Sequence, residues 1–248
     1  MELMVKWIYL SPHFDDVALS VGGMVWEQAR MGDGVEIWTI CAGDPLADRP
    51  LTDYAHMLHI LWELGEDVPY KRSQEDAACC RVLGASSLRY TVPDNVYRIL
   101  PGTDEAVVRV PEDNFGPLEP AESYLIPPVA DFLRKNLPGG CQVVVPLTIG
   151  NHRDHVLVRR AAERLGIPLW HYVDYPYVIQ KETDLRDWVP AKAETKTIPI
   201  SPAGLRAWQG GFACHRSQIL LLWPDEDEMR TAVENYFQSG GGCTLWKF

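Results

Sequence analysis

The sequence predicts an α/β fold in which a mostly parallel central sheet is covered by helices. Short apolar runs alternate with segments of helical spacing along the 248 residues, which is typical of strands joined by crossover helices. Two of these runs, 5–10 and 142–147, are each followed at once by a motif of histidines and aspartates that leads into a helical pattern. Because the carboxyl ends of parallel strands meet at one edge of a sheet, we expect both motifs at that edge, where open α/β sheets place their sites.

The same alternation assigns the other segments in order. Apolar runs rich in β-branched and aromatic residues predict strands at 5–10, 35–40, 87–92, 142–147, 168–173 and 195–200. Apolar residues at helical spacing predict helices at 16–31, 54–64, 72–83, 121–136, 152–165, 202–217 and 224–237. The long segment 95–120 is rich in Pro, Gly and acidic residues, so we expect a lid, a substrate wall or a mobile loop there.

The composition indicates a globular enzyme with one domain over residues 1–248. The chain is 46% hydrophobic and 23% charged, which is enough for a single α/β core. It contains no internal repeat, low-complexity tract or interdomain linker. The net charge of −11, with no basic run longer than Arg159-Arg160, argues against a nucleic-acid partner.

The sequence also favours a cytoplasmic location. No apolar run has the length needed to cross a bilayer, and the N-terminus enters a strand without the pattern of a secretory signal. The six cysteines include no C-x-x-C pair, and several lie within apolar patterns. They are therefore expected to be buried reduced thiols rather than a disulfide framework or a metal site.

The first motif, Ser11-Pro12-His13-Phe14-Asp15-Asp16, places metal-ligating residue types at the start of a helix. Residues three apart lie on one face of a helix, whereas neighbours diverge by about 100°. His13 and Asp16 can therefore share one metal ion, while Asp15 points elsewhere and stays close. Taken alone, a pair of aspartates before a helix is more often an N-cap with favourable first-turn charge.

The second motif, Gly150-Asn151-His152-Arg153-Asp154-His155, has two histidines three apart with an aspartate between them. Taken alone, such a pair is usually surface decoration on a helix. Together, at equivalent strand ends, the two motifs predict a site with two imidazoles, one carboxylate and an open water position. That is the pattern of catalytic rather than structural zinc. Asp15 is then placed to act as the general base for the water.

These residues resemble the LmbE-like, or PIG-L, superfamily of zinc-dependent N-deacetylases. The resemblance rests on residues 12–16, with Gly22-Gly23 shortly after, and on residues 152–155. Further blocks that resemble bacterial members lie at 72–76, 83–85, 93–94, 172–177 and 215–218. The resemblance implies a Rossmann-like three-layer sandwich whose site lies at the carboxyl edge of the strands.

The resemblance also implies which residues bind the metal. It assigns zinc binding to His13, Asp16 and His155, in agreement with the spacing of the motifs. A site of two histidines and one aspartate also accepts Fe²⁺ or another divalent metal. The expected cofactor is therefore Zn²⁺, with Fe²⁺ or another divalent ion as the alternative.

The catalytic roles are implied in the same way. Asp15 would be the general base, His152 would face the developing oxyanion, and Asp154 would orient or charge-tune His152. The chain departs from the family pattern at Phe14 and Val17, where members often have Pro and Glu. Neither departure removes a ligand or the base.

Arg72 and Asp94 are the expected substrate contacts, because the corresponding family blocks border the sugar site. Each also has a structural alternative, an ion pair of Arg72 along its own helix and an Asx-turn at Asp94. A lysine that commonly precedes the last block of the family is Trp208 here, and the apolar surroundings of His215 favour a core or cap histidine.

The implied reaction is removal of an N-acetyl or related N-acyl group from a small-molecule amino sugar or glycoconjugate. Some members of the family are homo-oligomers. One alternative is a non-catalytic carbohydrate-binding or regulatory relative of the same fold. A nucleotide-binding enzyme is disfavoured, because G-x-G-x-x-G is absent and Asp15 and Asp16 would repel a pyrophosphate at the helix N-terminus.

Overall fold

The computed structural model describes residues 4–47, 49–65 and 67–248, and these form a seven-stranded sheet in the order β3-β2-β1-β4-β5-β7-β6. The strands are β1 (Lys6–Ser11), β2 (Gly34–Thr39), β3 (Ser86–Arg89), β4 (Gln142–Pro146), β5 (Leu169–Tyr172), β6 (Glu194–Thr197) and β7 (Thr244–Lys247). Strands β1 to β5 pair in parallel, and β7 runs antiparallel to its neighbours β5 and β6. The predicted α/β class with a mostly parallel sheet is confirmed.

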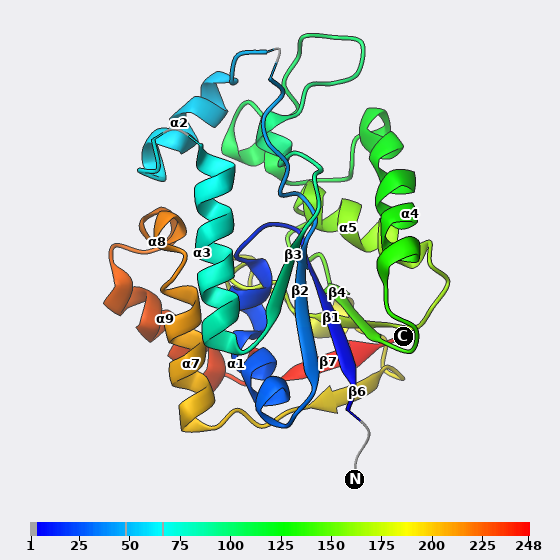
Figure 1. The fold of residues 1–248 in the computed structure, drawn as a ribbon, viewed down its shortest axis with the longest axis vertical. Helices are drawn as coiled ribbons and strands as arrows, with labels where there is room; N and C mark the ends of the chain where they lie inside the picture. The colour runs from blue at the N-terminus through cyan, green and yellow to red at the C-terminus, as the bar shows by residue number, and fades with distance from the viewer. Residues whose placement is uncertain (1–3, 48, 66) are drawn as a thin grey trace.

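Helices cover both faces of the sheet (Figure 1). They are α1 (Asp16–Arg30), α2 (Asp53–Leu61), α3 (Val68–Leu83), α4 (Ile126–Asn136), α5 (Arg153–Glu163), α6 (Tyr177–Gln180), α7 (Pro202–Phe212), α8 (Arg216–Leu222) and α9 (Glu226–Gln238). Helices α1, α3, α7 and α9 lie against one face, and α4 and α5 against the other. Among the described residues, no helix is long and apolar enough to span a membrane.

Strand β1 shows why the central strands are continuous apolar runs. Trp7 and Tyr9 pack into the core beneath α1 and α7, whereas Ile8 and Leu10 pack into the core beneath α4 and α5. Successive side chains of a strand point to opposite faces, and here both faces are covered, so every β1 residue after Lys6 is buried. This buried strand gives the first motif a rigid support.

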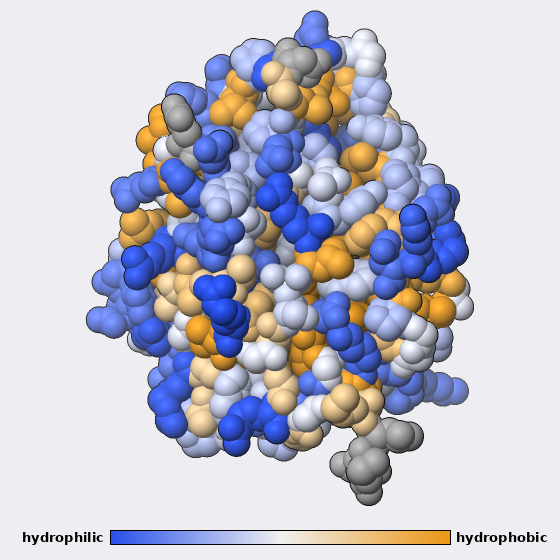
Figure 2. Space-filling model, viewed as in Figure 1, coloured by the Kyte–Doolittle hydropathy of each residue, from blue (hydrophilic) through white to orange (hydrophobic). Residues whose placement is uncertain are grey.

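A third apolar cluster covers the carboxyl ends of the strands. We call α2 together with residues 95–118 the cap; it contains the short 3₁₀ helices Asn95–Tyr97 and Pro111–Asn114, and its apolar side chains pack on one another. Segment 95–120, for which a lid, a wall or a mobile loop was expected, is here a wall packed against α2. Met57 and Ile60 of α2 are exposed, and hydrophobic residues reach the surface at this end of the molecule (Figure 2).

Two predictions about the C-terminal third need correction. The predicted helix 202–217 is two helices, because His215 leaves the helical conformation at ψ 59° and a new helix begins at Arg216. Glu75 of α3 receives hydrogen bonds from the backbone N and Oγ of Ser217, at 3.0 and 2.5 Å, and so caps that new helix. Strand β7 was not predicted, since its four residues gain their pairing from β5 and β6, which are distant in sequence.

Candidate active site

Both predicted motifs lie at the carboxyl edge of the sheet, on adjacent strands. Strands β1 and β4 pair in parallel with Tyr9 opposite Val144, so the turns that follow them emerge side by side. We call these two turns, residues 11–16 and 147–155, the floor of the site. The second turn needs left-handed backbone at Gly150 (φ 85°) and Asn151 (φ 56°), residue types that tolerate it.

Asp16 lies between two histidines, one from each turn. Its Oδ2 is 3.3 Å from His13 Nδ1, and its Oδ1 is 3.2 Å from His155 Nε2. His155 Nε2 is buried and has no hydrogen-bond partner with acceptable geometry among the residues that the structure describes. A buried ring nitrogen without a partner, facing a carboxylate and a second imidazole, is the donor set that Zn²⁺ and Fe²⁺ take. These residues therefore fit a divalent metal ion.

The opposite ring nitrogen of each histidine is held by a second carboxylate. His13 Nε2 lies 3.0 Å from Asp154 Oδ2, and His155 Nδ1 lies 2.6 Å from Asp174 Oδ1. Asp174 also accepts a hydrogen bond from the backbone N of Ile149, at 3.0 Å. Carboxylates in this position orient metal-binding histidines and fix which nitrogen stays free. Asp174 was not singled out from the sequence, although it stands two residues after the end of β5, in block 172–177.

Asp15 lines the same cavity as His13 and Asp16. Burial raises the pKa of Asp15, Arg72 lowers it, Asp16 raises it, and the net direction is upward. Arg72 Nη2 is 3.5 Å from Asp15 Oδ1. A carboxylate with a raised pKa binds a proton more readily near neutral pH, which suits a general base.

His152 is buried and held in its neutral form. Burial lowers its pKa well below the usual value, and the neighbouring His13 and His155 lower it further. Its Nδ1 accepts a hydrogen bond from the backbone N of Asp154 at 3.3 Å, so the neutral ring carries its proton on Nε2. That nitrogen is therefore a hydrogen-bond donor.

The expected link from the Asp154 carboxylate to His152 is not what the structure shows. The carboxylate instead contacts His13, the backbone N of Asn95 at 3.0 Å, and Nη2 of Arg98 at 2.5 Å. Burial alone would raise the pKa of Asp154, but Arg98 and His13 hold it well below its usual range. Asp154 is thus a buried carboxylate ion that orients His13.

Arg72 and Asp94 both face the site. Arg72 Nη1 is 3.6 Å from Asp94 Oδ2, and its guanidinium lies over the ring of Trp62 at 4.7 Å. Arg72 thus points into the site rather than along its own helix. Asp94 does form the Asx-turn that was its alternative, through Oδ1 and the backbone N of Val96, and its Oδ2 still faces His13 Nε2 at 3.8 Å.

The floor and cap enclose a cavity of about 320 Å³. Phe115 of the cap packs edge-on against His152 and against Tyr177, with ring centroids 5.7 and 5.6 Å apart. The cavity is lined by His13, Asp15, Asp16, Tyr54, Leu58, Trp62, Arg72, Asp94, Asn95, Asn114, Phe115, His152, Tyr175, Tyr177, Gln180, Gln218, Leu221 and others. Sequence reasoning missed Phe115, because nothing local to residue 115 indicates its contact with His152.

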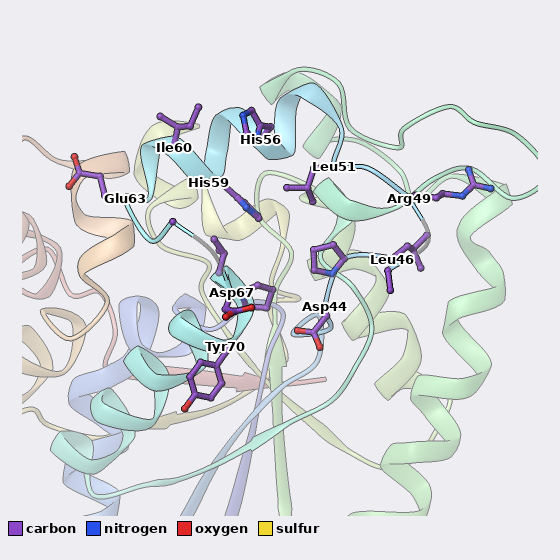
Figure 3. Close-up of a pocket in the computed structure, with 15 residues that line it drawn as sticks. Asp44, Leu46, Arg49, Leu51, His56, His59, Ile60, Glu63, Asp67 and Tyr70 are labelled. Carbon is purple, nitrogen blue, oxygen red and sulfur yellow. The ribbon is translucent and has the colours of Figure 1, made fainter.

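A larger cavity, of about 1090 Å³, lies on the other face of α2 (Figure 3). His56 and His59 of α2 line it, whereas Tyr54 and Leu58 of the same helix line the smaller cavity. No residue of either motif lines the larger cavity. We therefore place the candidate site in the smaller one, where the motifs and the groups with shifted pKa values meet.

His215 is a buried residue at the start of α8. Its ring packs near Phe212, with centroids 5.7 Å apart, and its Nε2 has no partner. Burial, with a smaller contribution from Arg72, lowers the pKa of His215 to about 3. It is therefore neutral, as expected for a core or cap histidine.

Comparisons with known proteins agree with this geometry. The model of the family PIG-L, described as GlcNAc-PI de-N-acetylase, matches residues 8–165, which include both motifs. A 2'-N-acetylparomamine deacetylase from Niallia circulans is 29% identical over 243 residues, which cover 90% of this chain and 84% of that protein.

Solved structures extend the likeness to the whole fold. The zinc-inhibited form of teicoplanin deacetylase Orf2 superposes with a TM-score of 0.81 at 25% identity, covering 98% of this chain and 97% of the other. N,N'-diacetylchitobiose deacetylase from Pyrococcus horikoshii, at 17% identity and a TM-score of 0.56, shares the fold over 98% of this chain and 82% of its own.

Proposed function

Because the chain belongs to the PIG-L family, we propose that it is a divalent-metal-dependent hydrolase that removes an N-acetyl or related N-acyl group from an amino sugar or glycoconjugate. One observation carries the proposal: Asp16 lies between His13 Nδ1 and His155 Nε2, and Asp15 lies beside them. The activities named for the relatives, deacetylation of N-acetylparomamine and of teicoplanin, support the same class of substrate.

His13, Asp16 and His155 would hold the metal ion, and Zn²⁺ suits two imidazoles and a carboxylate. When bound, the ion acidifies a water molecule and polarises the amide carbonyl. Asp154 and Asp174 keep the two histidines in the tautomers that leave Nδ1 of His13 and Nε2 of His155 free.

Asp15 accepts the proton of the attacking water and passes it to the departing amine, so that one carboxylate serves both steps of amide hydrolysis. Its raised pKa suits both directions of transfer. His152, neutral with its proton on Nε2, donates a hydrogen bond to the oxygen that becomes negative in the tetrahedral intermediate.

The cavity is suited to a sugar ring. Arg72 and Asp94 offer hydrogen bonds to hydroxyl groups, and Phe115 and Tyr177 form an aromatic wall against which a sugar face can stack. At about 320 Å³ the cavity has the volume of a small-ligand site. The remainder of a larger glycoconjugate would extend beyond it.

Amine release from N-acetylated amino sugars tests the proposal. We expect release by the wild-type protein loaded with Zn²⁺, and a loss of roughly 10²–10⁴-fold in kcat in Asp15→Asn. The matched control is Asp184→Asn, an aspartate that pairs with Arg186 on the surface. Equal rates in wild type and Asp15→Asn would exclude the assigned base, and substrate binding without release by the loaded wild type would favour a binding protein.

A further inference from the structure

Arg98 of the cap makes three hydrogen bonds although it is 5% exposed. Its Nε donates to Glu122 Oε1 at 2.7 Å, its Nη1 to the carbonyl of Pro93 at 3.0 Å, and its Nη2 to Asp154 Oδ1 at 2.5 Å. Glu122 and Asp154 are buried as well. Burying a guanidinium and the two carboxylates that it bridges has a large desolvation cost. Solubility at the surface cannot account for a buried arginine, so its position points to a role at the site.

The bridge continues to a proposed metal ligand. Arg98 occupies Oδ1 of Asp154, and the other oxygen, Oδ2, accepts hydrogen bonds from the backbone N of Asn95 and from His13 Nε2, both at 3.0 Å. With its proton on Nε2, His13 has its lone pair on Nδ1, the nitrogen that faces Asp16. The chain of contacts therefore runs from Glu122 through Arg98 and Asp154 to His13.

His13 also has a competing set of neighbours. His13, Asp94 and Asp154 offer ligand atoms that all lie within 4.8 Å of one another, as do His13, His152 and His155. Asp94 and Asp154 face Nε2 of His13, whereas Asp16 faces Nδ1 on the opposite side of the imidazole. A carboxylate already bound by a guanidinium is a poorer metal ligand, since it must give up a charge-assisted hydrogen bond.

We propose that Arg98, held by Glu122, is a positioning residue that keeps Asp154 as a hydrogen-bond acceptor and so directs the metal ion to the Nδ1 side of His13. The inference rests on the proposed function, since it concerns the ligands of the same site. It assigns a role to the cap beyond enclosing the substrate. Arg98 touches neither the reacting atoms nor the proposed ion.

The test compares Arg98→Lys and Arg98→Met/Glu122→Leu with wild type. The double variant removes both members of the ion pair, so that no charge is left unpaired at residue 122. Arg134→Met is the matched control, because Arg134 pairs with Asp131 on α4, at 2.6 Å, outside the floor and the cap. The readouts are the Kd for Zn²⁺, by competition with a chromophoric chelator, and the visible absorption of the Co²⁺ form.

We expect the double variant to bind Zn²⁺ about 10–100-fold more weakly and to show an altered Co²⁺ spectrum. Arg98→Lys should fall between it and wild type, because lysine keeps the charge but lacks the planar fork by which Nε and Nη2 reach the two carboxylates. Arg134→Met should match wild type in both readouts. Circular dichroism confirms that each variant is folded.

Wild-type Kd and Co²⁺ spectra in the folded Arg98 variants would overturn the proposal. If the double variant does not fold, Arg98→Lys decides: a wild-type Kd and spectrum overturn the proposal, and weaker binding with a shifted spectrum supports it. Failure of the proposed function looks different, because it is seen in the wild-type protein itself, which would then bind no metal ion or, once loaded, release no amine.

Discussion

The floor of the site and its cap are held by different interactions. The floor consists of turns on buried strands, and its histidines are fixed by carboxylates such as Asp154 and Asp174. The cap packs chiefly through its own apolar cluster, with Arg98 as its buried ionic link to the floor. Fixed charge is what metal binding and proton transfer need, whereas an aromatic and apolar wall selects what fits beside them. Changes in the floor, or in the Arg98 link to it, should therefore alter metal binding and kcat, and changes in the apolar and aromatic wall of the cap should alter KM.

Removing a floor histidine should have the largest effect. His155→Ala deletes the unpartnered Nε2 that faces Asp16, so we expect loss of the bound metal and at least a roughly 10³-fold fall in kcat/KM. Metal analysis and amine release measure both. His59→Ala is the control, because this cap histidine contacts Tyr97 at 2.8 Å and lies on the other side of α2. Retained metal in His155→Ala would remove this residue from the ligand set.

Weakening the support of that histidine should have a smaller effect. Asp174→Asn replaces the carboxylate that lies 2.6 Å from His155 Nδ1 by an amide of similar size. We expect the Kd for Zn²⁺ to rise about 10–100-fold. Competition with a chelator measures the change. An unaltered Kd would mean that the floor does not depend on its outer carboxylates.

A change in the cap should act mainly on substrate binding. Phe115→Ala removes a ring that packs against His152 and Tyr177, and we expect KM to rise about 2–10-fold with little change in kcat. Steady-state kinetics separate the two constants. Phe132→Ala is the control. Phe132 does not line the cavity, and its ring stacks on that of Tyr90 with the centroids 4.1 Å apart. A large fall in kcat with constant KM would break the division between floor and cap.

Asp76 of α3 should give the smallest effect, and only at high pH. Burial, with a contribution from Asp15, raises the pKa of Asp76 to about 7. Because its pKa is raised in the folded state, Asp76 makes its full contribution to stability below the pKa of the unfolded chain. That contribution is lost as the pH rises through 7. We expect Asp76→Asn to raise the Tm by about 2–4 °C at pH 8 and to change it little at pH 4. Thermal unfolding at both pH values checks this, and an equal shift at both would contradict it.

The floor could be predicted from the sequence because its signals are local. A strand fixes where a turn begins, and a spacing of three residues fixes which side chains share a face, so His13 and Asp16 could be placed together. The convergence of His155 with them followed from the parallel arrangement of two strands. The catalytic and metal-binding roles of these residues remain predictions.

The other contacts depend on segments far apart in the chain. Arg98 and Glu122 lie in weakly patterned segments, and only the folded chain brings them to Asp154. Asp154 was expected to orient or charge-tune His152, and its charge does raise the pKa of His152 against the larger lowering by burial. Its carboxylate contacts other partners, however, because neighbours in sequence need not share a side-chain contact. Likewise the break before α8 depends on a cap from Glu75, 142 residues away. Propensity and spacing carry no information about such partners.

The position of the bound metal tests the central claim most directly. We would soak crystals of the protein in Zn²⁺ and collect anomalous diffraction data at the zinc edge. The account predicts one strong peak between His13 Nδ1, Asp16 and His155 Nε2. A peak on the Nε2 side of His13, among Asp94 and Asp154, or no peak in this cavity, would contradict it.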